Sequence, residues 1–182
     1  MGEPSKELEP PKALLKIVRF IDTYIGEWSG RIFMLLIFPL IGGLTYEVVV
    51  RYLFNAPTIW AYEFAYMVYG AHFMLGAAYC LKKGGHIRTD LLYDMFPVRW
   101  QGRVDAVLYL FFFFPGMIYF FAAGWVEAFH SLSIMEHSEQ SPWQPLLFPF
   151  KSAVFVGAAL LIIQGVSEFL KSAYAGLRGK WL

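Results

Sequence analysis

The chain has 182 residues, of which 58% are hydrophobic and only 16% are charged. Soluble domains are usually about half apolar and about a quarter charged, so this composition indicates a membrane protein. The formal net charge of +1 gives no general attraction for nucleic acid, and the single cysteine, Cys80, excludes an internal disulfide framework and any multi-cysteine metal site.

Four stretches of the chain are long and apolar enough to cross a membrane as helices. A bilayer core of about 30 Å needs about 20 apolar residues in an α-helix. The predicted spans are residues 32–50, 60–81, 104–126 and 150–170. We therefore predict an all-α integral membrane protein with a single four-span domain over residues 12–170. Residues 1–11 are predicted to be a disordered cytoplasmic tail, and residues 171–182 a second cytoplasmic tail.

Lysine and arginine are unevenly distributed around these spans. Five precede the first span, five lie between the second and third, and three follow the fourth, whereas the two remaining loops share only Arg51 and Lys151. Positively charged loops stay on the cytoplasmic side of a membrane. Both termini and the loop after the second span are therefore predicted to be cytoplasmic, which agrees with an even number of spans.

Residues 12–28 precede the first span and have an amphipathic pattern. Basic residues lie on one side of a helix through this segment, and the other side carries a stripe of Leu14, Ile17, Val18, Ile21, Tyr24, Ile25 and Trp28. This pattern is typical of a helix that lies in the membrane interface. We predict an interfacial arm helix over residues 12–28, with Trp28 at the lipid interface. The alternative is an extension of the first span that packs on a partner.

Charged residues occur near the ends of the spans rather than in their middle. Glu47 and Arg51 close the first span, and Glu63 lies one turn into the second. The i, i+4 spacing of Glu47 and Arg51 favours an ion pair, and the short connection between the spans would let Glu63 share Arg51. We interpret these residues as a structural clamp. A proton or ion ligand is the alternative, because charges in spans are costly and often functional.

The sequence offers no convincing set of catalytic, haem or metal ligands. A haem held between helices needs two histidines at equal depth, and only His72 lies well inside a span. The serines are not accompanied by a GxSxG motif, and the residues around Glu136 match no familiar metal spacing. We therefore predict no catalytic residue and no cofactor on this chain.

A polar stretch, KKGGHIRTDLLYDMFP, follows the second span at residues 82–97. Gly84 and Gly85 can end the helix with positive φ angles. The stretch and its surroundings supply the remaining candidates: Lys82, Lys83 and Trp100 for the lipid interface, and His86, Arg88 and Asp90 for hydrogen bonds that hold this elbow or a partner subunit.

The segments RYLFNAPTIWAYEFAY and GAHFMLGAAYCLKKGGHIRTDLL, followed later by SPWQP, FPFK and LLIIQGVSE, resemble a known family in their order and spacing. They are similar to the small permease subunit of tripartite ATP-independent periplasmic (TRAP) transporters, the DctQ-like family, and especially to its mannitol and chloroaromatic branch. The resemblance covers nearly the whole chain beyond residue 12. Thr89 stands where the family commonly has valine.

This resemblance implies a tripartite importer driven by a sodium gradient. A periplasmic protein would capture an organic acid, a large membrane subunit would carry it inward and bind the sodium, and the small subunit would widen the stationary scaffold in the bacterial inner membrane. It assigns Arg51, Trp60 and Glu63 to the periplasmic edge, where they fix the first hairpin and face the binding protein. The acidic segment from Glu136 to Pro145, tipped by Trp143, is a second candidate docking surface.

Two other functions remain open from the residues themselves. The chain could anchor a redox enzyme in the membrane, with or without haem. It could also be a small proton-coupled multidrug exporter in which Glu47 or Glu63 is the proton site. Four short-looped spans with no evident repeat and no charge near the midplane offer little to bind a solute, so we favour a membrane partner of a larger protein.

Overall fold

The structure is a computed structural model, and it describes residues 10–85, 93 and 95–182. Over these ranges the chain forms helices, and its one β-type contact is an isolated bridge between His137 and Leu146. The helical elements, including π-helices η1 and η3 and the 3-10 helix η2, are α1 (Lys12–Phe20), η1 (Ile21–Trp28), α2 (Ser29–Phe33), η2 (Met34–Leu36), α3 (Ile37–Leu53), α4 (Ala61–Lys82), α6 (Val98–Leu108), η3 (Tyr109–Phe113), α7 (Phe114–Ser133) and α8 (Phe148–Arg178).

Consecutive elements join into four long helices, which confirms the predicted all-α membrane fold. The continuous helices run over Lys12–Leu53, Ala61–Lys82, Val98–Ser133 and Phe148–Arg178, and each is long and apolar enough to cross a bilayer. The shortest, α4, has 22 residues. At about 1.5 Å per residue it measures roughly 33 Å, which matches the apolar thickness of a membrane.

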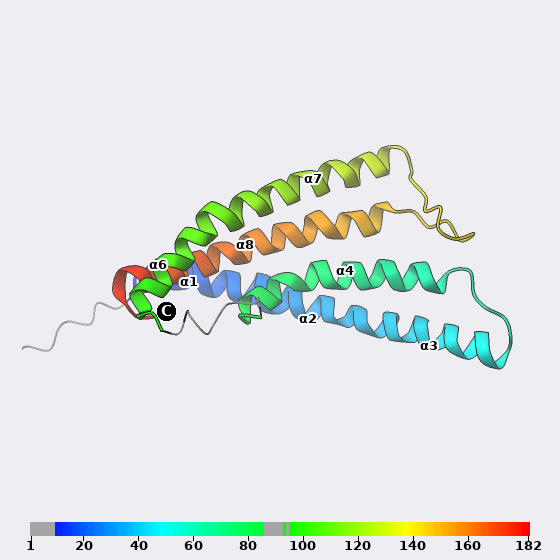
Figure 1. The fold of residues 1–182 in the computed structure, drawn as a ribbon, viewed down its shortest axis with the longest axis horizontal. Helices are drawn as coiled ribbons and strands as arrows, with labels where there is room; N and C mark the ends of the chain where they lie inside the picture. Colours follow the sequence, from blue (N-terminus) through cyan, green and yellow to red (C-terminus); the bar gives the residue numbers. More distant parts are fainter. Residues whose placement is uncertain (1–9, 86–92, 94) are drawn as a thin grey trace, which may run out of the picture.

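The four helices are arranged as two neighbouring pairs (Figure 1). One pair is α3 with α4, the other is α7 with α8, and α8 also packs along α4 and α6. The buried positions of α8 include many small residues: Ala153, Gly157, Ala158, Ser167, Ala175 and Gly176. Small side chains let helix backbones approach closely inside a membrane. We call the end with residues 54–60 and 134–147 the hairpin end, and the opposite end, where α1 begins and α8 finishes, the terminal end.

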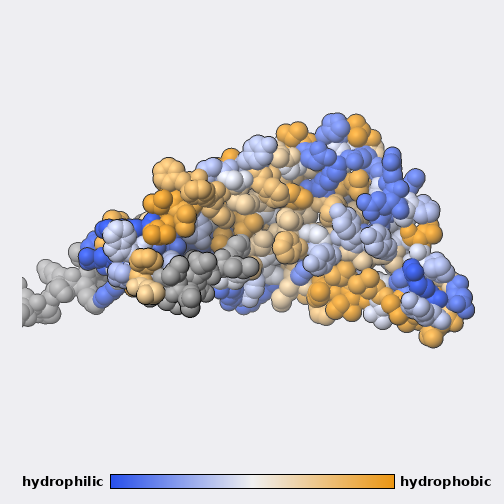
Figure 2. Space-filling model, viewed as in Figure 1, coloured by the Kyte–Doolittle hydropathy of each residue, from blue (hydrophilic) through white to orange (hydrophobic). Residues whose placement is uncertain are grey.

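The outer surface of the helices is largely apolar. Large hydrophobic side chains are exposed along every long helix, including Phe38, Phe73, Phe112 and Tyr119. Figure 2 shows hydrophobic residues over much of the middle of one face and hydrophilic residues gathered toward its two ends. A water-soluble protein rarely exposes so much contiguous apolar surface, so lipid or another protein must cover it.

The first helix runs without a break from the arm segment into the first span. Its 42 residues would measure roughly 63 Å at about 1.5 Å per residue, about twice the thickness of a bilayer core. The extra length, α1 and η1, packs along α8 within the same chain. How residues 12–28 lie relative to the membrane stays a prediction.

The end of α4 confirms the role predicted for Gly84. Its φ is +69°, in the left-handed region that glycine adopts readily. The Gly85 N–H donates to the Cys80 carbonyl at 2.9 Å and the Gly84 N–H to the Leu81 carbonyl at 3.0 Å. These two bonds make a Schellman motif, which satisfies carbonyls that a helix end otherwise leaves free. Gly85 itself does not have a positive φ.

Candidate functional site

Glu47 organises the first hairpin at the hairpin end. Its carboxylate accepts hydrogen bonds from the Arg51 Nε at 2.7 Å and the Thr58 backbone N–H at 3.1 Å, and also from the Thr58 hydroxyl. The Ala61 N–H at the start of α4 donates to Thr58 Oγ1 at 3.3 Å. The predicted pair of Glu47 and Arg51 is therefore present, and Thr58, which sequence reasoning missed, carries its effect to the next helix.

Trp60 lies between the first two spans. Its ring stacks on Tyr46 of α3 with centroids 5.9 Å apart and meets Phe64 of α4 edge to face at 5.7 Å. Aromatic pairs in these geometries add about 0.5–1.5 kcal/mol beyond the area they bury. Trp60 is therefore half-buried and joins the two helices of the first hairpin through its ring.

Glu63 does not share Arg51, which corrects the clamp expected from the sequence. Glu63 is only 2% exposed, and its Oε2 accepts a hydrogen bond from the Ser141 hydroxyl in the α7–α8 connection. Among the described residues its Oε1 has no partner, and Arg51 instead pairs with Glu47. The reason is that α4 turns Glu63 inward toward the second hairpin, whereas Arg51 stays on the outer side of the first.

Ser141 also orders the neighbouring loop. Its Oγ accepts a hydrogen bond from the backbone N–H of Trp143 at 3.2 Å, and Trp143 is exposed. One serine hydroxyl therefore connects the buried Glu63 to an exposed aromatic residue. The two candidate docking segments predicted separately from the sequence meet at this point.

Replacing Ser141 with alanine is expected to lower the free energy of unfolding by about 2 kcal/mol, because it removes the hydrogen-bond partner that the described residues give to a buried carboxyl group. The check is denaturant unfolding of the purified chain in mixed micelles. Ser133→Ala is the matched control, because the hydroxyl of that exposed residue donates to the His130 carbonyl of its own helix. Equal small effects of the two substitutions would mean that Ser141 does not support Glu63.

Lys151 pairs with two carboxylates where the acidic α7–α8 connection meets the helices. Its Nζ lies 2.6 Å from Oε1 of Glu127 and 2.6 Å from Oε2 of Glu136. The hydrogen bond from Lys151 lowers the pKa of Glu136 below its usual 4.5. The predicted acidic docking surface is thus partly compensated, and Glu139 remains as its exposed carboxylate.

The lowered pKa of Glu136 predicts a pH dependence. A carboxylate of this kind stabilises the fold above its ordinary pKa of 4.5, and the contribution is lost as the pH falls through the lower folded value. Between about pH 6 and about pH 3 the thermal midpoint of the wild type in detergent should therefore fall more than that of Glu136→Gln. Glu139→Gln, which alters an exposed carboxylate of the same loop, should keep the wild-type slope. Parallel curves for all three proteins would contradict this assignment.

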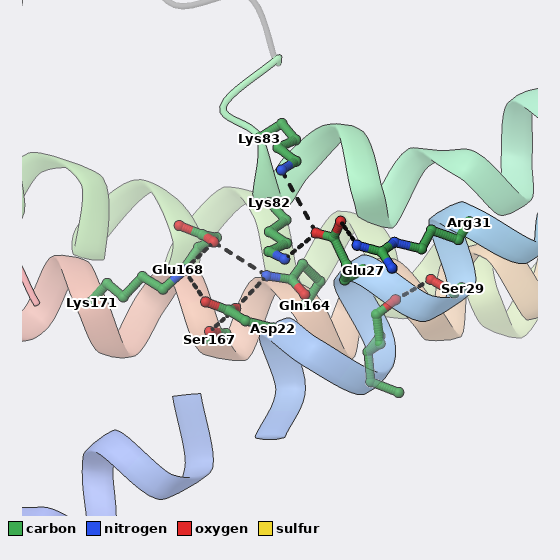
Figure 3. A network of polar contacts seen from close by, with 11 residues as sticks. Asp22, Glu27, Ser29, Arg31, Lys82, Lys83, Gln164, Ser167, Glu168 and Lys171 are labelled. Atoms are coloured by element: carbon green, nitrogen blue, oxygen red, sulfur yellow. Dashed lines mark hydrogen bonds and ion pairs between the residues drawn. The ribbon is translucent and has the colours of Figure 1, made fainter. Parts of the chain in front are cut away.

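A second polar network joins three helices at the terminal end (Figure 3). Asp22 of η1 accepts hydrogen bonds from Gln164 at 2.9 Å and Ser167 at 2.6 Å, and it pairs with Lys171 at 2.7 Å. Lys171 also contacts Glu168 at 2.7 Å. Four side chains of the network thus come from one helix, α8, and Asp22 fastens the arm segment to it.

Glu27 makes the corresponding connection to α4. Its carboxylate lies 2.6 Å from Lys82 Nζ, 3.7 Å from Lys83 Nζ and 3.2 Å from Arg31 (Figure 3). Lys82 was predicted to lie at the lipid interface, which stays a prediction. Its side chain is only 20% exposed and forms this internal pair. Lys83 keeps more than half of its side-chain surface exposed.

The π-helical form of η1 explains why both carboxylates reach their partners. Asp22 and Glu27 are five residues apart, and residues at this spacing stand about 140° apart around an α-helix of about 3.6 residues per turn. In a π-helix the i to i+5 hydrogen bond makes such residues neighbours along the axis. η1 therefore presents Asp22 and Glu27 together to α8 and α4.

The remaining predicted residues fall into two groups. Trp28 and Trp100 are exposed, and their place at the lipid interface stays a prediction. His86, Arg88 and Asp90 lie outside the described residues. Their predicted role in holding the elbow or a partner subunit stays a prediction.

Two of the three histidines that the structure describes make structural contacts through their rings. His72, midway along α4, places Nδ1 3.0 Å from the Phe33 carbonyl and so links α4 to α2. His137 places Nδ1 2.7 Å from the Gln144 carbonyl in the α7–α8 connection. Within residues 10–85, 93 and 95–182 no three His, Cys, Asp or Glu residues are grouped as metal ligands would be.

The polar contacts described above join helices of the chain to one another, at the hairpin end and at the terminal end. The comparison with individually curated proteins gave no match. A family model described as "Tripartite ATP-independent periplasmic transporters, DctQ component" matches residues 40–174, which include α4, α6, α7 and both hairpin connections. The chain therefore belongs to the DctQ family and is the small membrane subunit of a TRAP transporter.

Proposed function

We propose that this subunit is a stationary, non-catalytic scaffold in an importer that a sodium gradient drives. The large permease subunit would bind both sodium and the organic acid, and this chain would widen the frame against which the moving part works. It would lie in the bacterial inner membrane with both termini in the cytoplasm. Its place in the mannitol and chloroaromatic branch of the family stays a prediction.

The distribution of charge is the observation that carries this proposal. Four stretches contain no Asp, Glu, Lys or Arg at all: residues 32–46, 64–81, 106–126 and 152–167. Each lies within one of the four long helices. Ion and solute sites of secondary transporters lie near the membrane midplane and use polar groups there. A membrane chain whose charged groups lie only outside the middle of its spans is suited to packing against a transporter rather than to carrying a solute itself.

Reconstitution tests the scaffold role. Liposomes would contain the large subunit with or without this chain, together with the binding protein and a labelled organic acid, and uptake would be measured under an inward sodium gradient. We expect full uptake only with both membrane subunits and none with this chain alone. Transport by this chain alone would favour the exporter, and a Soret band of the purified chain would favour a haem-bearing anchor.

We further propose that the hairpin end helps to dock the loaded binding protein. The support is the contact between Glu63 and Ser141, which joins the two connections into one surface that carries the exposed Trp143. The hairpin end would face the periplasm in the predicted orientation. Exposed tryptophan is a common anchor residue in protein interfaces.

Trp143→Ala is therefore expected to weaken docking while leaving the membrane complex assembled. Uptake should fall several-fold when the binding protein is limiting and recover when it is in excess, because loss of an anchor of about 1–2 kcal/mol mainly lowers affinity. Trp100→Ala removes another exposed tryptophan ring, from the terminal end, and is the matched control. The same loss of uptake in both variants would contradict docking at Trp143.

A further inference from the structure

Charge is unevenly divided within the polar network of the terminal end. Glu27 contacts three basic residues, Arg31, Lys82 and Lys83, and this group has an excess of two positive charges. Asp22 and Glu168 share the single cation of Lys171 on the inner side, which leaves an excess of one negative charge there. The network as a whole carries one more cation than it has carboxylates, and its positive excess lies toward α4.

The positive excess is also the exposed part of the network. The side chains of Arg31 and Lys83 are 59% and 53% exposed, whereas those of Asp22 and Lys171 are 20% exposed each. Figure 3 shows Arg31 and Lys83 reaching the Glu27 carboxylate from two different sides. Arg31 contacts Glu27 through one terminal nitrogen, so most of the five N–H donors of its guanidinium remain available to a second acceptor.

An exposed apolar strip continues from Arg31 along the first long helix. Ile32 and Leu35, which follow Arg31, are each slightly more than half exposed, and so is Trp28, which precedes it. With Arg31 they follow an i, i+3, i+4, i+7 spacing, which places them on one face of a helix. A cationic head at one end of an exposed apolar strip matches the shape of a phospholipid, whose charged phosphate lies at the membrane surface and whose acyl chains extend into the core.

We propose that Arg31 and Lys83 form a binding site for the phosphodiester group of an anionic phospholipid, with one acyl chain lying along Ile32 and Leu35. Arginine binds phosphate oxygens through its planar fork, and lysine adds a compact charge beside it. Glu27 orients both cations but neutralises only one of the three that surround it. Lys82, which is held closest to Glu27, joins the first helix to α4 beneath the headgroup.

The apolar strip distinguishes a lipid from soluble phosphate as the ligand. Soluble phosphate would use only the two cations, whereas a phospholipid also covers Ile32 and Leu35. Each cation near an anionic membrane contributes about 1 kcal/mol, which corresponds to about a fivefold change in affinity. Loss of both cations should therefore weaken binding about thirtyfold.

Native mass spectrometry of the full chain in a neutral detergent tests the site. The chain would be titrated with phosphatidylglycerol, with phosphatidylcholine and with inorganic phosphate. We expect preferential retention of phosphatidylglycerol by the wild type and about thirtyfold weaker binding by Arg31→Gln with Lys83→Gln. Because Glu27 and Lys82 are unchanged in that variant, their 2.6 Å contact should keep α4 joined to the first helix.

The matched control is Lys16→Gln with Arg19→Gln, which also removes one lysine and one arginine, both exposed, from the same long helix. It should retain phosphatidylglycerol nearly as well as the wild type. Equal losses in the two double variants would show a general charge effect and overturn the proposal. So would binding of phosphatidylcholine or inorganic phosphate as tight as that of phosphatidylglycerol. Thermal midpoints of both variants confirm that the folded chain is being compared.

Discussion

Gly102→Leu is expected to be among the most destabilising single substitutions in this chain, with a loss of about 3 kcal/mol in the free energy of unfolding. A Cβ atom at residue 102 would lie 2.3 Å from the Gly176 nitrogen and 2.5 Å from the Ser172 carbonyl oxygen. Both are backbone atoms of α8, so no side-chain rotation can relieve the overlap. The two helices would have to separate.

The expected separation would reach beyond the substituted residue. Gly176 also packs closely against α6, since a Cβ there would lie 3.0 Å from the Arg103 nitrogen, and Arg103 Nε donates to the Gly176 carbonyl at 3.3 Å. This contact packs α6 against the last turns of α8, next to the network at Lys171. Loss of it should therefore weaken both the packing and the polar network.

Gly116→Leu is a control within the same continuous helix, because nothing lies within 4 Å of a Cβ at that residue. It should change the free energy of unfolding by less than about 1 kcal/mol. The measurement is unfolding of the purified chains in mixed micelles of increasing SDS fraction, followed by tryptophan fluorescence. Similar stability of the two variants would mean that α6 and α8 are not packed backbone to backbone.

Hydropathy was sufficient to predict the four helices because crossing a membrane requires a fixed length of apolar chain. The second predicted span, residues 60–81, differs from α4, Ala61–Lys82, by one residue at each end. The third and fourth helices extend well beyond residues 104–126 and 150–170. Their polar turns lie outside the apolar stretch, where hydropathy carries no signal but helical hydrogen bonds can continue.

The candidate site was predictable only where its contacts are local in sequence. Glu47 and Arg51 are four residues apart, and helix geometry alone indicates their pairing. Glu63 and Ser141 are 78 residues apart, and Asp22 and Gln164 are 142 apart. Such pairs depend on which faces of the helices pack together. Composition and periodicity do not determine which faces pack together when the helices are apolar on nearly every side.

One signal for the terminal-end network was present in the sequence. Asp22 and Glu27 interrupt an otherwise basic and apolar arm segment, and Gln164 lies inside a charge-free stretch of the fourth span. Polar groups placed where burial is expected usually have partners. The pairing stayed hidden because α-helical spacing puts Asp22 and Glu27 on different faces, and only the π-helical form of η1 brings them together.

Asp22→Ala is expected to release the arm segment from α8 and to lower the free energy of unfolding by about 2–4 kcal/mol. The substitution removes the acceptor of the Ser167 hydroxyl and one of the two carboxylates that pair with Lys171. It also removes the nearer of two acceptors of Gln164 Nε2, which keeps only Glu168 at 3.2 Å. Gln164 and Ser167 are fully buried, so neither can turn to water instead. Glu168 still pairs with Lys171, which limits the loss.

Three measurements separate this expectation from a general loss of charge. In mixed micelles, Asp22→Ala should unfold at a lower SDS fraction than Glu139→Ala, which removes an exposed carboxylate of the second hairpin. Spin labels at residue 16 and at exposed residue 177 of α8 should report a broader distance distribution when Asp22 is lost. A double-mutant cycle with Lys171→Ala should give a coupling of about 1–3 kcal/mol, because residues in direct ionic contact are not additive. Additive effects and an unchanged distance distribution would show that Asp22 does not hold the arm segment, whose attachment would then rest on the contacts of Glu27.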